Sequence, residues 1–398
     1  MLIYKTFRYR IYPTTAQKFR MSEWENALRF LWNLANEQRR MGLARPQRIY
    51  RTAFDQQKEL TTLRAELPWL ADVSRNVCTN LLVELDKAWQ RCFKRSAHAP
   101  RWKRRGRDAF GFTEVDPGRC RLDSRLRFPK LGQIRIKLHR PLEGEPKKYT
   151  INRDGDQWFV SIVCEIEINP TQRTEPIVAI DRGITNVVAD SNEKIERNPQ
   201  HLERALKRLA RAQRTVARRQ KGSKNKEKAK IRVMRIHRKV RRQRAHILHA
   251  LTTTYAESQG TVVVERLQIA NMEKNRQLSR RIGGAGWGQL VEMLRYKLAW
   301  SGGQLAEVSA HYSSQTCAAC GHIDATSRAR ESFHCTVCGH RDHADVNAAK
   351  VLKQRYLEVR ANRSCQPVEA SSTDGLRNRK VKLRVSRRAS QNSDKNWN

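Results

Sequence analysis

Two Cys-x-x-Cys pairs near the end of the sequence form its clearest set of metal ligands. Cys317 and Cys320 make the first pair, and Cys335 and Cys338 follow after an interval of 14 residues. Four thiolates in two tight turns suit a tetrahedral zinc ion, and a glycine that tolerates positive φ follows each pair. Four unrelated buried cysteines or two disulfides are the alternatives, but neither explains the matched spacing. The quartet predicts a structural zinc site.

Three acidic residues stand at the ends of predicted elements, far apart in the sequence. Asp181 and Glu265 each end a short, mainly apolar run, 177–180 and 261–264. Such runs are typical of central strands in an α/β sheet, and ligands bind such sheets at the carboxyl ends of the strands. Asp345 begins a helix and continues its apolar stripe, although a helix cap would explain this residue alone. Together the three acids predict one site.

Carboxylates gathered in this way would repel one another and take up protons unless cations held them. Their hard oxygen ligands favour Mg²⁺ or Mn²⁺. Two such ions, about 4 Å apart, can activate a water and stabilise the leaving oxygen of a phosphodiester. No Walker loop or Ser-His-Asp set competes with this interpretation. Asp190, Asp324 and Asp342 lie in polar or turn-like surroundings, and Asp342 is the rival to Asp345.

The charge of the chain points to a polyanionic partner. Lys and Arg total 80 against 39 acidic residues, a formal net charge of +41. Nucleic acid is the natural partner for such a charge, because no apolar run approaches the ~18 residues of a membrane-spanning helix. The first residues alternate like a strand, which argues against a signal peptide. The five cysteines outside the quartet show no pairing pattern, which predicts a reducing compartment, the cytoplasm or nucleoid.

The first half of the chain predicts strands interrupted by helices. Residues 3–12 alternate as a half-buried strand with a basic outer face. Thr14 and Gln17 form a capping-box pattern for a helix through about Arg40, and further helical segments run to Trp89. These helices form a small domain inserted after the first strand.

A basic stretch and a group of strands follow. In residues 90–107, Lys and Arg surround Trp102, which suits phosphate contacts with a stacked base; a solvated linker is an equal alternative. Residues 108–168 are strand-like, with a hairpin turning at Asp154-Gly155. The first strand and this group are expected to close one barrel.

The second half predicts an α/β domain with a strongly basic insertion. A return strand at 185–189 and a strand at 304–309 join those that end in Asp181 and Glu265. Between them, 199–260 forms a helical hairpin whose exposed faces are nearly all Arg and Lys. Charge of a single sign destabilises an isolated helix, so nucleic-acid contact explains it better than a solvated face.

The order of these motifs resembles that of the TnpB (OrfB) proteins of insertion-sequence transposons, which are compact relatives of type V CRISPR effectors. The resemblance is carried by IDRGITN around Asp181, VVVERLQIANM around Glu265, AGWGQL from Ala285, and SSQTCAACGH with FHCTVCGHRDHADVNAA, which contains Asp345. It is dense from about Ile177 onward and looser over YKTFRYRIYPT near the beginning.

The resemblance implies an α/β multidomain protein: an RNase H-like RuvC nuclease domain with an inserted zinc ribbon, preceded by a wedge β-barrel carrying a helical recognition insert. The expected boundaries are 1–16 and 106–172 for the barrel, 17–105 for the helical domain, 173–310 and 341–362 for the nuclease domain, 311–340 for the ribbon and 363–398 for a disordered basic tail.

It also implies an RNA-guided DNA endonuclease that cuts double-stranded target DNA beside a transposon-adjacent motif. Asp181, Glu265 and Asp345 match the catalytic Mg²⁺ ligands of the family, and the cysteine quartet matches its zinc site. The expected partners are a guide RNA from the transposon end, one protein chain per RNA, in a bacterial or archaeal cell. Two alternatives remain: an RNA-guided repressor that does not cut, and an accessory protein or strand-transferring transposase.

Overall fold

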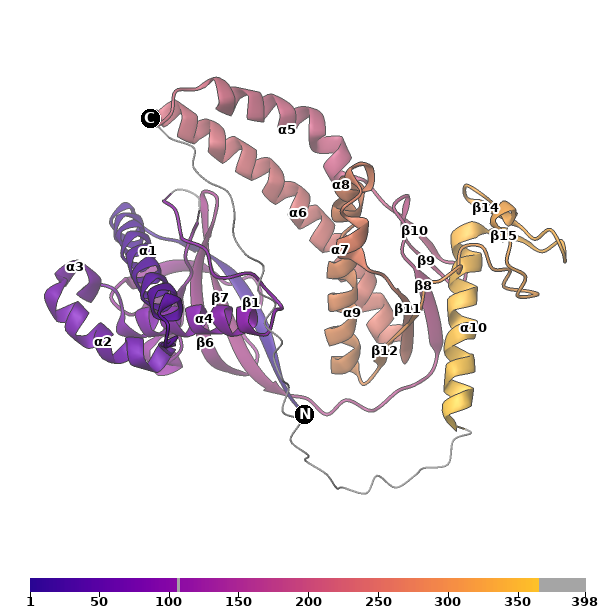
Figure 1. Cartoon of the computed structure of the whole chain (residues 1–398), viewed down its shortest axis with the longest axis horizontal. Coiled ribbons are helices and arrows are strands. Elements are labelled where there is room, and N and C mark those ends of the chain that lie inside the picture. Colours follow the sequence, from indigo (N-terminus) through magenta and orange to yellow (C-terminus); the bar gives the residue numbers. More distant parts are fainter. Residues whose placement is uncertain (106–107, 365–398) are drawn as a thin grey trace. The chain divides into compact units, whose positions relative to one another are not determined.

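The computed structural model describes residues 1–105 and 108–364 (Figure 1). It divides into two compact units, Met1–Tyr356 and Leu357–Asn398. Everything that positions the predicted site lies in the first unit. Of the predicted tail 363–398, residues 365–398 lie outside the described residues, and 363–364 end a helix.

A seven-stranded antiparallel sheet is built from the first strand and the 108–168 region, with strand order β2-β6-β7-β1-β5-β4-β3. β1 runs along both β7 and β5 and therefore holds the two halves of the sheet together. The pairings leave β2 and β3 at the two ends of the described sheet, so closure into a barrel stays a prediction. The strands are β1 Leu2–Tyr12, β2 Phe112–Glu114, β3 Arg121–Leu122, β4 Arg125–Phe128, β5 Gly132–Lys137, β6 Glu145–Asp154 and β7 Gln157–Glu167.

Four helices share a hydrophobic core with this sheet. The capping box at Thr14 and Gln17 is present as predicted, but α1 continues past Arg40. Trp24 of α1 meets Phe112 of β2 edge to face, with ring centroids 5.5 Å apart, so helices and sheet share one core. The helices are α1 Thr15–Ala44, α2 Ala53–Glu66, α3 Pro68–Ala71 and α4 Arg75–Phe93.

A five-stranded mixed sheet contains the predicted strands of the second half, in the order β10-β9-β8-β11-β12. β8, β11 and β12 are parallel, β9 pairs antiparallel with β8, and β10 pairs antiparallel with β9. Ile180 pairs with Val264, so the residues that follow each of them, Asp181 and Glu265, lie at the same edge. The strands are β8 Ile177–Asp181, β9 Asn186–Asp190, β10 Ile195–Arg197, β11 Thr261–Arg266 and β12 Gln304–Ser309.

Helices cover both faces of this sheet, which explains why its central strands are apolar throughout. One face packs on α6 and α9 through residues such as Leu248 and Leu294, and the other packs on α10 through Leu352. Figure 1 shows α9 and α10 on opposite sides of β8 and β11. The helices are α5 His201–Arg218, α6 Lys224–Ser258, α7 Ile269–Met272, α8 Arg276–Ala285, α9 Trp287–Ser301 and α10 Ala344–Ser364.

The hairpin predicted at 199–260 is present as α5 and α6. The glycine pattern at 283–288 predicts the start of one helix, but its first glycines close α8 and only Gly286, at φ 76°, separates α8 from α9. The periodicity of the last helix predicts an end near Arg360, whereas α10 runs to Ser364.

Three short strands, β13 Arg328–Ala329, β14 Ser332–His334 and β15 Arg341–His343, form a small third sheet around the cysteines. Two 3-10 turns, η1 Pro117–Arg119 and η2 Ala325–Ser327, complete the elements. Among the described helices, none is both long and apolar enough to cross a membrane.

Candidate metal centres

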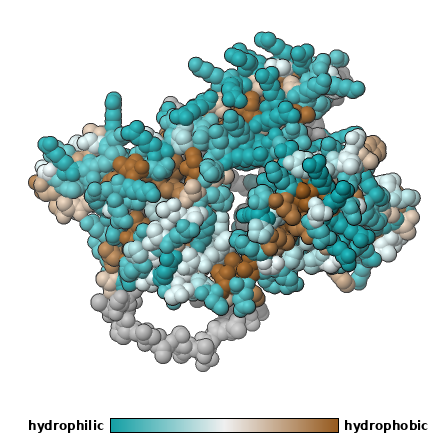
Figure 2. Space-filling view, turned by 180° about the vertical axis from the view of Figure 1, so that it is seen from behind, coloured by the Kyte–Doolittle hydropathy of each residue, from teal (hydrophilic) through white to brown (hydrophobic). Residues whose placement is uncertain are grey.

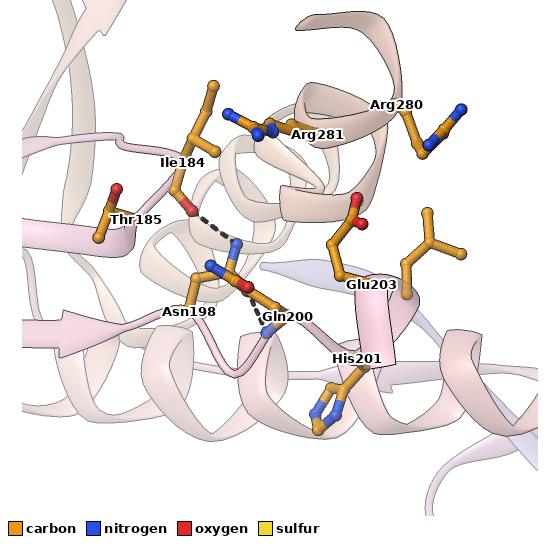
Figure 3. A pocket seen from close by; sticks show the side chains of 10 residues that line it. Ile184, Thr185, Asn198, Gln200, His201, Glu203, Arg280 and Arg281 are labelled. Atoms are coloured by element: carbon orange, nitrogen blue, oxygen red, sulfur yellow. Dashed lines mark hydrogen bonds between the residues drawn. The ribbon is translucent and has the colours of Figure 1, made fainter. Parts of the chain in front are cut away.

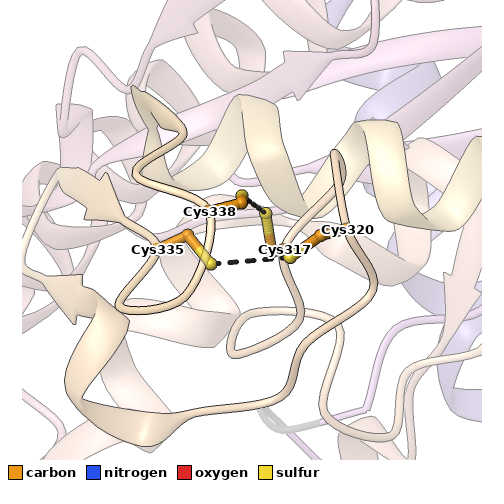
Figure 4. A group of neighbouring side chains, drawn as sticks. All are labelled: Cys317, Cys320, Cys335 and Cys338. Carbon is orange, nitrogen blue, oxygen red and sulfur yellow. Dashed lines mark hydrogen bonds between the residues drawn. The ribbon is translucent and has the colours of Figure 1, made fainter.

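The four cysteines converge on one point (Figure 4). Their Sγ atoms all lie within 4.8 Å of one another, and Cys317–Cys338 and Cys320–Cys335 are each separated by 3.6 Å. Zinc–sulfur bonds of about 2.3 Å in a tetrahedron place sulfurs about 3.8 Å apart, so the quartet fits zinc. Hydrogen bonds from the backbone N–H groups of Cys338 and Val337 lower the pKa of Cys335 to about 6. Burial raises the pKa of Cys317. A backbone hydrogen bond alone would lower the pKa of Cys320, but hydrogen bonds with the neighbouring thiols raise it to about 12, so these two thiolates depend on a bound metal ion.

The cysteine turns are fastened to α10, the helix that carries Asp345. The Asn347 side chain accepts a hydrogen bond from the Ala318 N–H at 2.9 Å and donates one to the Thr316 carbonyl at 2.7 Å. Cys317 and Cys335 are buried together with Phe333 and Ala344. A zinc ion here would therefore stabilise the start of the helix that presents the third acid.

The fold brings the three predicted acids together from β8, β11 and the first turn of α10. Burial, followed by the negative charges of Glu265 and Asp345, raises the pKa of Asp181 well above its ordinary value. Burial is also the main cause that raises the pKa of Glu265. Only 7% of Glu265 and 8% of Asp345 are exposed. These are carboxylates that need cations to remain ionised.

Two arginines that the sequence did not single out lie against these acids. The Nε atom of Arg182 lies 3.7 Å from a Glu265 carboxylate oxygen, and the Arg328 guanidinium bonds the Asp345 carboxylate at 2.7 Å. Among the described residues, the cysteine quartet is the only group of three or more potential metal ligands whose ligand atoms come this close together, within 4.8 Å. Two of the three neighbouring acids, Glu265 and Asp345, are thus paired with arginines, and the three acids are spaced more widely than the thiolates.

The loop after β8 lies directly against the Asp345 carboxylate. Asn186 donates a hydrogen bond to the Asp345 carboxylate at 2.9 Å, and the Trp287 indole donates one to the Gly183 carbonyl at 3.0 Å. A Cβ atom on Gly183 would lie 2.9 Å from the Asn186 carbonyl oxygen and 3.6 Å from the Asp345 carboxylate. Glycine is therefore required at this position by the close approach of the loop to the acid.

The other acids considered from the sequence have structural partners. Asp342, the rival to Asp345, forms an ion pair with Lys350 at 2.9 Å, and its carboxylate lies 3.8 Å from the His340 Nε2 atom. Asp190 accepts a hydrogen bond from the buried Tyr255 hydroxyl at 2.7 Å. Asp324 caps the η2 turn. None of the three is part of the acidic cluster among the described residues.

A basic pocket of about 270 Å³ opens beside the same loop (Figure 3). Its walls include Thr185 next to the acidic cluster, His201 at the start of α5, and Arg280 and Arg281 on α8. One acid, Glu203, also lines the pocket, so the two arginines leave it with a net positive charge. Its lining begins at Ile184, the residue that follows Gly183.

The hairpin of α5 and α6 carries the predicted charge, and Figure 2 shows hydrophilic side chains covering it. Part of this charge is already paired within the chain. Arg235 and Arg238 each form an ion pair with Asp156 at 2.8 Å. Burial alone would raise the pKa of Asp156, but the hydrogen bonds from the two arginines outweigh it and lower the pKa to about 2. This network could not be predicted from the sequence, because Asp156 lies in the hairpin turn between β6 and β7, far along the chain from α6.

Comparisons with known proteins agree with the order of these features. Family models match residues 161–276 as OrfB of IS605 ("Probable transposase"), 287–352 as the Cas12f1-like TNB domain, and 1–45 as a helix-turn-helix domain. In this structure, residues 1–45 are strand β1 followed by the whole of the long helix α1.

Two relatives align over most of the chain. A Streptomyces pristinaespiralis protein named "Putative RNA-guided DNA endonuclease" is 34% identical over 93% of this chain and 94% of its own. InsQ of Escherichia coli K12, with the same designation, is 31% identical over 87% of this chain and 90% of its own.

Among solved structures, the chain is similar to the protein in the Cas12f1–sgRNA–target DNA complex, at 15% identity and a TM-score of 0.35, covering 89% of this chain and 100% of that one. A CasPhi-2 (Cas12j) structure bound to crRNA gives 11% identity and a TM-score of 0.41, covering 88% and 98%. The full-length sequence matches, together with the family models, show that this chain belongs to the OrfB (TnpB) family of IS605-type transposon proteins, related to Cas12f.

Proposed function

We propose that the chain is an RNA-guided DNA endonuclease of an insertion-sequence transposon, which cuts target DNA beside a short adjacent motif. The observation that carries the proposal is the convergence of Asp181, Glu265 and Asp345 at one sheet edge, where burial and mutual repulsion raise the pKa of Asp181. The names of the relatives over nearly their whole length support the same activity.

The three acids would hold Mg²⁺ or Mn²⁺, because clustered carboxylate oxygens are the ligands that these ions prefer. Bound divalent ions would supply an activated water and a counter-charge for the phosphodiester. Asn186 orients the Asp345 carboxylate, and Arg182 and Arg328 supply positive charge at the cluster. The basic pocket beside Thr185 would guide the substrate backbone toward the acids.

The domain roles follow from this assignment. The five-stranded sheet with its helices is the RuvC-like nuclease domain, 173–310 and 341–362, and the cysteine region 311–340 is its zinc ribbon. The seven-stranded sheet, 1–16 and 106–172, corresponds to the wedge barrel, with 17–105 as the helical recognition domain. A net charge of +41 supports a guide RNA and double-stranded DNA as partners. One chain per RNA is part of the same proposal.

Cleavage of a matched target tests the proposal. The protein is purified with its RNA, the RNA is sequenced, and a DNA duplex that matches its guide region is supplied with Mg²⁺. The proposal expects breaks in the matched duplex and none in a scrambled one. Matched DNA that is bound tightly but stays intact would instead identify an RNA-guided repressor, and joined DNA products would identify a strand-transferring transposase.

A further inference from the structure

A single arginine contacts Glu265 at both its main chain and its side chain. Arg182 follows Asp181 directly, one residue beyond the end of β8. Its guanidinium donates a hydrogen bond to the main-chain carbonyl of Glu265, and its Nε atom lies 3.7 Å from the carboxylate of the same residue. Two contacts to one residue limit the rotamers that the Glu265 side chain can adopt.

The pairing of β8 with β11 explains why the two strand ends need this contact. The last residues paired between the two strands are Ile180 and Val264. Asp181 and Glu265 follow them, on the face of the sheet that α10 covers. The bond from Arg182 to the Glu265 carbonyl joins the strand ends beyond their last paired residues. It therefore helps to set the separation of the two acids.

Arg182 is itself held in place and shielded from water. Its side chain is 3% exposed, and the Trp287 indole fixes the next residue by donating to the Gly183 carbonyl at 3.0 Å. Its Nε atom is buried and has no hydrogen-bond partner among the described residues. A shift of about 0.5 Å toward the Glu265 carboxylate would bring the two atoms within hydrogen-bonding distance. A guanidinium can serve a carbonyl and a carboxylate together because its donors form a fixed fork.

The arginine at the third acid lies in a different environment. Arg328 bonds the Asp345 carboxylate at 2.7 Å, but its side chain is 32% exposed. It can move into solvent when an ion takes its place. Arg182 has no such exit, and its departure would leave a buried carbonyl of Glu265 without this donor. Arg328 is thus a replaceable counter-charge, whereas Arg182 stays within the site.

We propose that Arg182 is a positioning residue, which orients the Glu265 carboxylate for a divalent ion by contacting its carbonyl and its carboxylate with one guanidinium. The inference rests on the proposed function, because it takes the ion to be bound by the acidic cluster. The charge of Arg182 balances Glu265 in the metal-free protein, but charge alone would repel an ion that binds beside it. Geometry and charge therefore predict opposite effects of a neutral substitution on metal affinity.

Binding of Mn²⁺ tests the proposal. Arg182→Lys keeps the charge but loses the fork, and Arg182→Gln removes the charge. The full-length chain, freed of RNA and loaded with zinc, is titrated with Mn²⁺, and free Mn²⁺ is followed by electron paramagnetic resonance. Ions at the cluster are those whose binding Asp181→Asn abolishes. Both Arg182 variants should lose about 10- to 100-fold in Mn²⁺ affinity there, the typical cost of removing a group that orients a metal ligand.

Arg173→Lys is the matched control. Arg173 is a partly buried arginine of the same domain that precedes the start of β8, whereas the acids lie at the carboxyl end of the strands. It donates to the carbonyls of Ser301, Glu257 and Ala256 at 3.2, 3.0 and 2.8 Å. Its substitution should lower the melting temperature, as Arg182→Lys also should, because both lose bonds to main-chain carbonyls. Only Arg182→Lys should lose Mn²⁺ affinity.

Tighter Mn²⁺ binding by Arg182→Gln would show that the arginine acts as a charge, and unchanged affinity in Arg182→Lys would show that its fork is not used; either result overturns the proposal. Equal losses of affinity in Arg182→Lys and the control would reduce the effect to lost stability and overturn it too. If Arg182→Gln does not fold, Arg182→Lys decides alone.

Failure of the proposed function would be recognised separately. Wild-type protein that binds no Mn²⁺ sensitive to Asp181→Asn would refute the metal site and, with it, the role of Arg182. Wild-type protein that binds Mn²⁺ in this way, together with an Arg182→Lys variant that binds it equally well, would refute only the role of Arg182.

Discussion

The cysteine quartet and the acidic cluster are two candidate metal centres of opposite character. The four cysteines come from one short stretch and already have the spacing of zinc ligands, with sulfur pairs at 3.6 Å. The three acids come from elements that are up to 164 residues apart in the sequence, and arginines neutralise two of them. A local ligand set is preorganised by its own turns, whereas a dispersed set depends on the whole fold and on the cations it receives.

Removing one acid should have the largest effect. Asp181→Asn keeps the size of the side chain but removes a charge that the cluster needs for divalent ions, so cleavage of matched DNA should fall by about 10³-fold or more. Binding of guide RNA and target DNA should stay within about twofold of wild type. Gel-based cleavage and filter binding measure the two effects, and a variant that still cuts at the wild-type rate would exclude Asp181 from the site.

Removing one thiolate should act through stability. Cys335→Ser leaves three zinc ligands, so bound zinc, measured by elemental analysis, should fall from one ion per chain to almost none. The melting temperature should drop by roughly 5 °C or more, since metal binding contributes directly to folding of such small units. Cys92→Ser, a half-buried cysteine outside the quartet, is the matched control and should retain zinc. A stable, zinc-free Cys335→Ser protein with full activity would contradict the structural role.

The contact between Arg328 and Asp345 links the two centres. Without Mg²⁺, Arg328→Gln leaves the Asp345 carboxylate less compensated, so the melting temperature should fall by about 1–3 °C. Added Mg²⁺ should restore more stability to this variant than to wild type, because the ion replaces the lost positive charge. Arg330→Gln, exposed two residues away, is the control and should behave as wild type. Identical Mg²⁺-induced shifts in all three proteins would show that the arginine and the ion do not share this site.

The smallest effect concerns pH. Because the pKa of Asp181 is raised in the folded protein, its contribution to stability is fully present below its ordinary value of 3.8 and is lost as pH rises through the raised pKa. Metal-free wild type should therefore lose stability relative to Asp181→Asn as pH rises from about 4 toward neutrality. Melting curves of both proteins without added Mg²⁺ measure the difference, and a constant difference across this range would rule out the raised pKa.

The local signals in the sequence predicted local structure well. Alternation gave strand β1, the capping box gave the start of α1, and the Asp154-Gly155 turn gave the hairpin of β6 and β7. The strands that end in Asp181 and Glu265 were visible because burial on both faces requires apolar runs. Each of these features is set by residues within a few positions of one another.

What the sequence could not predict depends on contacts between distant segments. Nothing near Arg328 indicates that it reaches Asp345, because that contact requires the small third sheet to pack on α10. The prediction of a single helix start at the glycines 283–288 was wrong, because Gly286 alone can separate two helices, α8 and α9, without a long loop. The pairing of α6 arginines with Asp156 likewise appears only once the hairpin turn meets the helix.

The most direct test is a structure of the protein with its RNA and matched DNA in the presence of Mn²⁺, whose anomalous scattering locates the ions. The proposed mechanism predicts Mn²⁺ bound by the carboxylates of Asp181, Glu265 and Asp345 at a DNA phosphate, with Arg328 released from Asp345. Mn²⁺ bound elsewhere, with both arginines still paired to their acids beside the DNA, would contradict it.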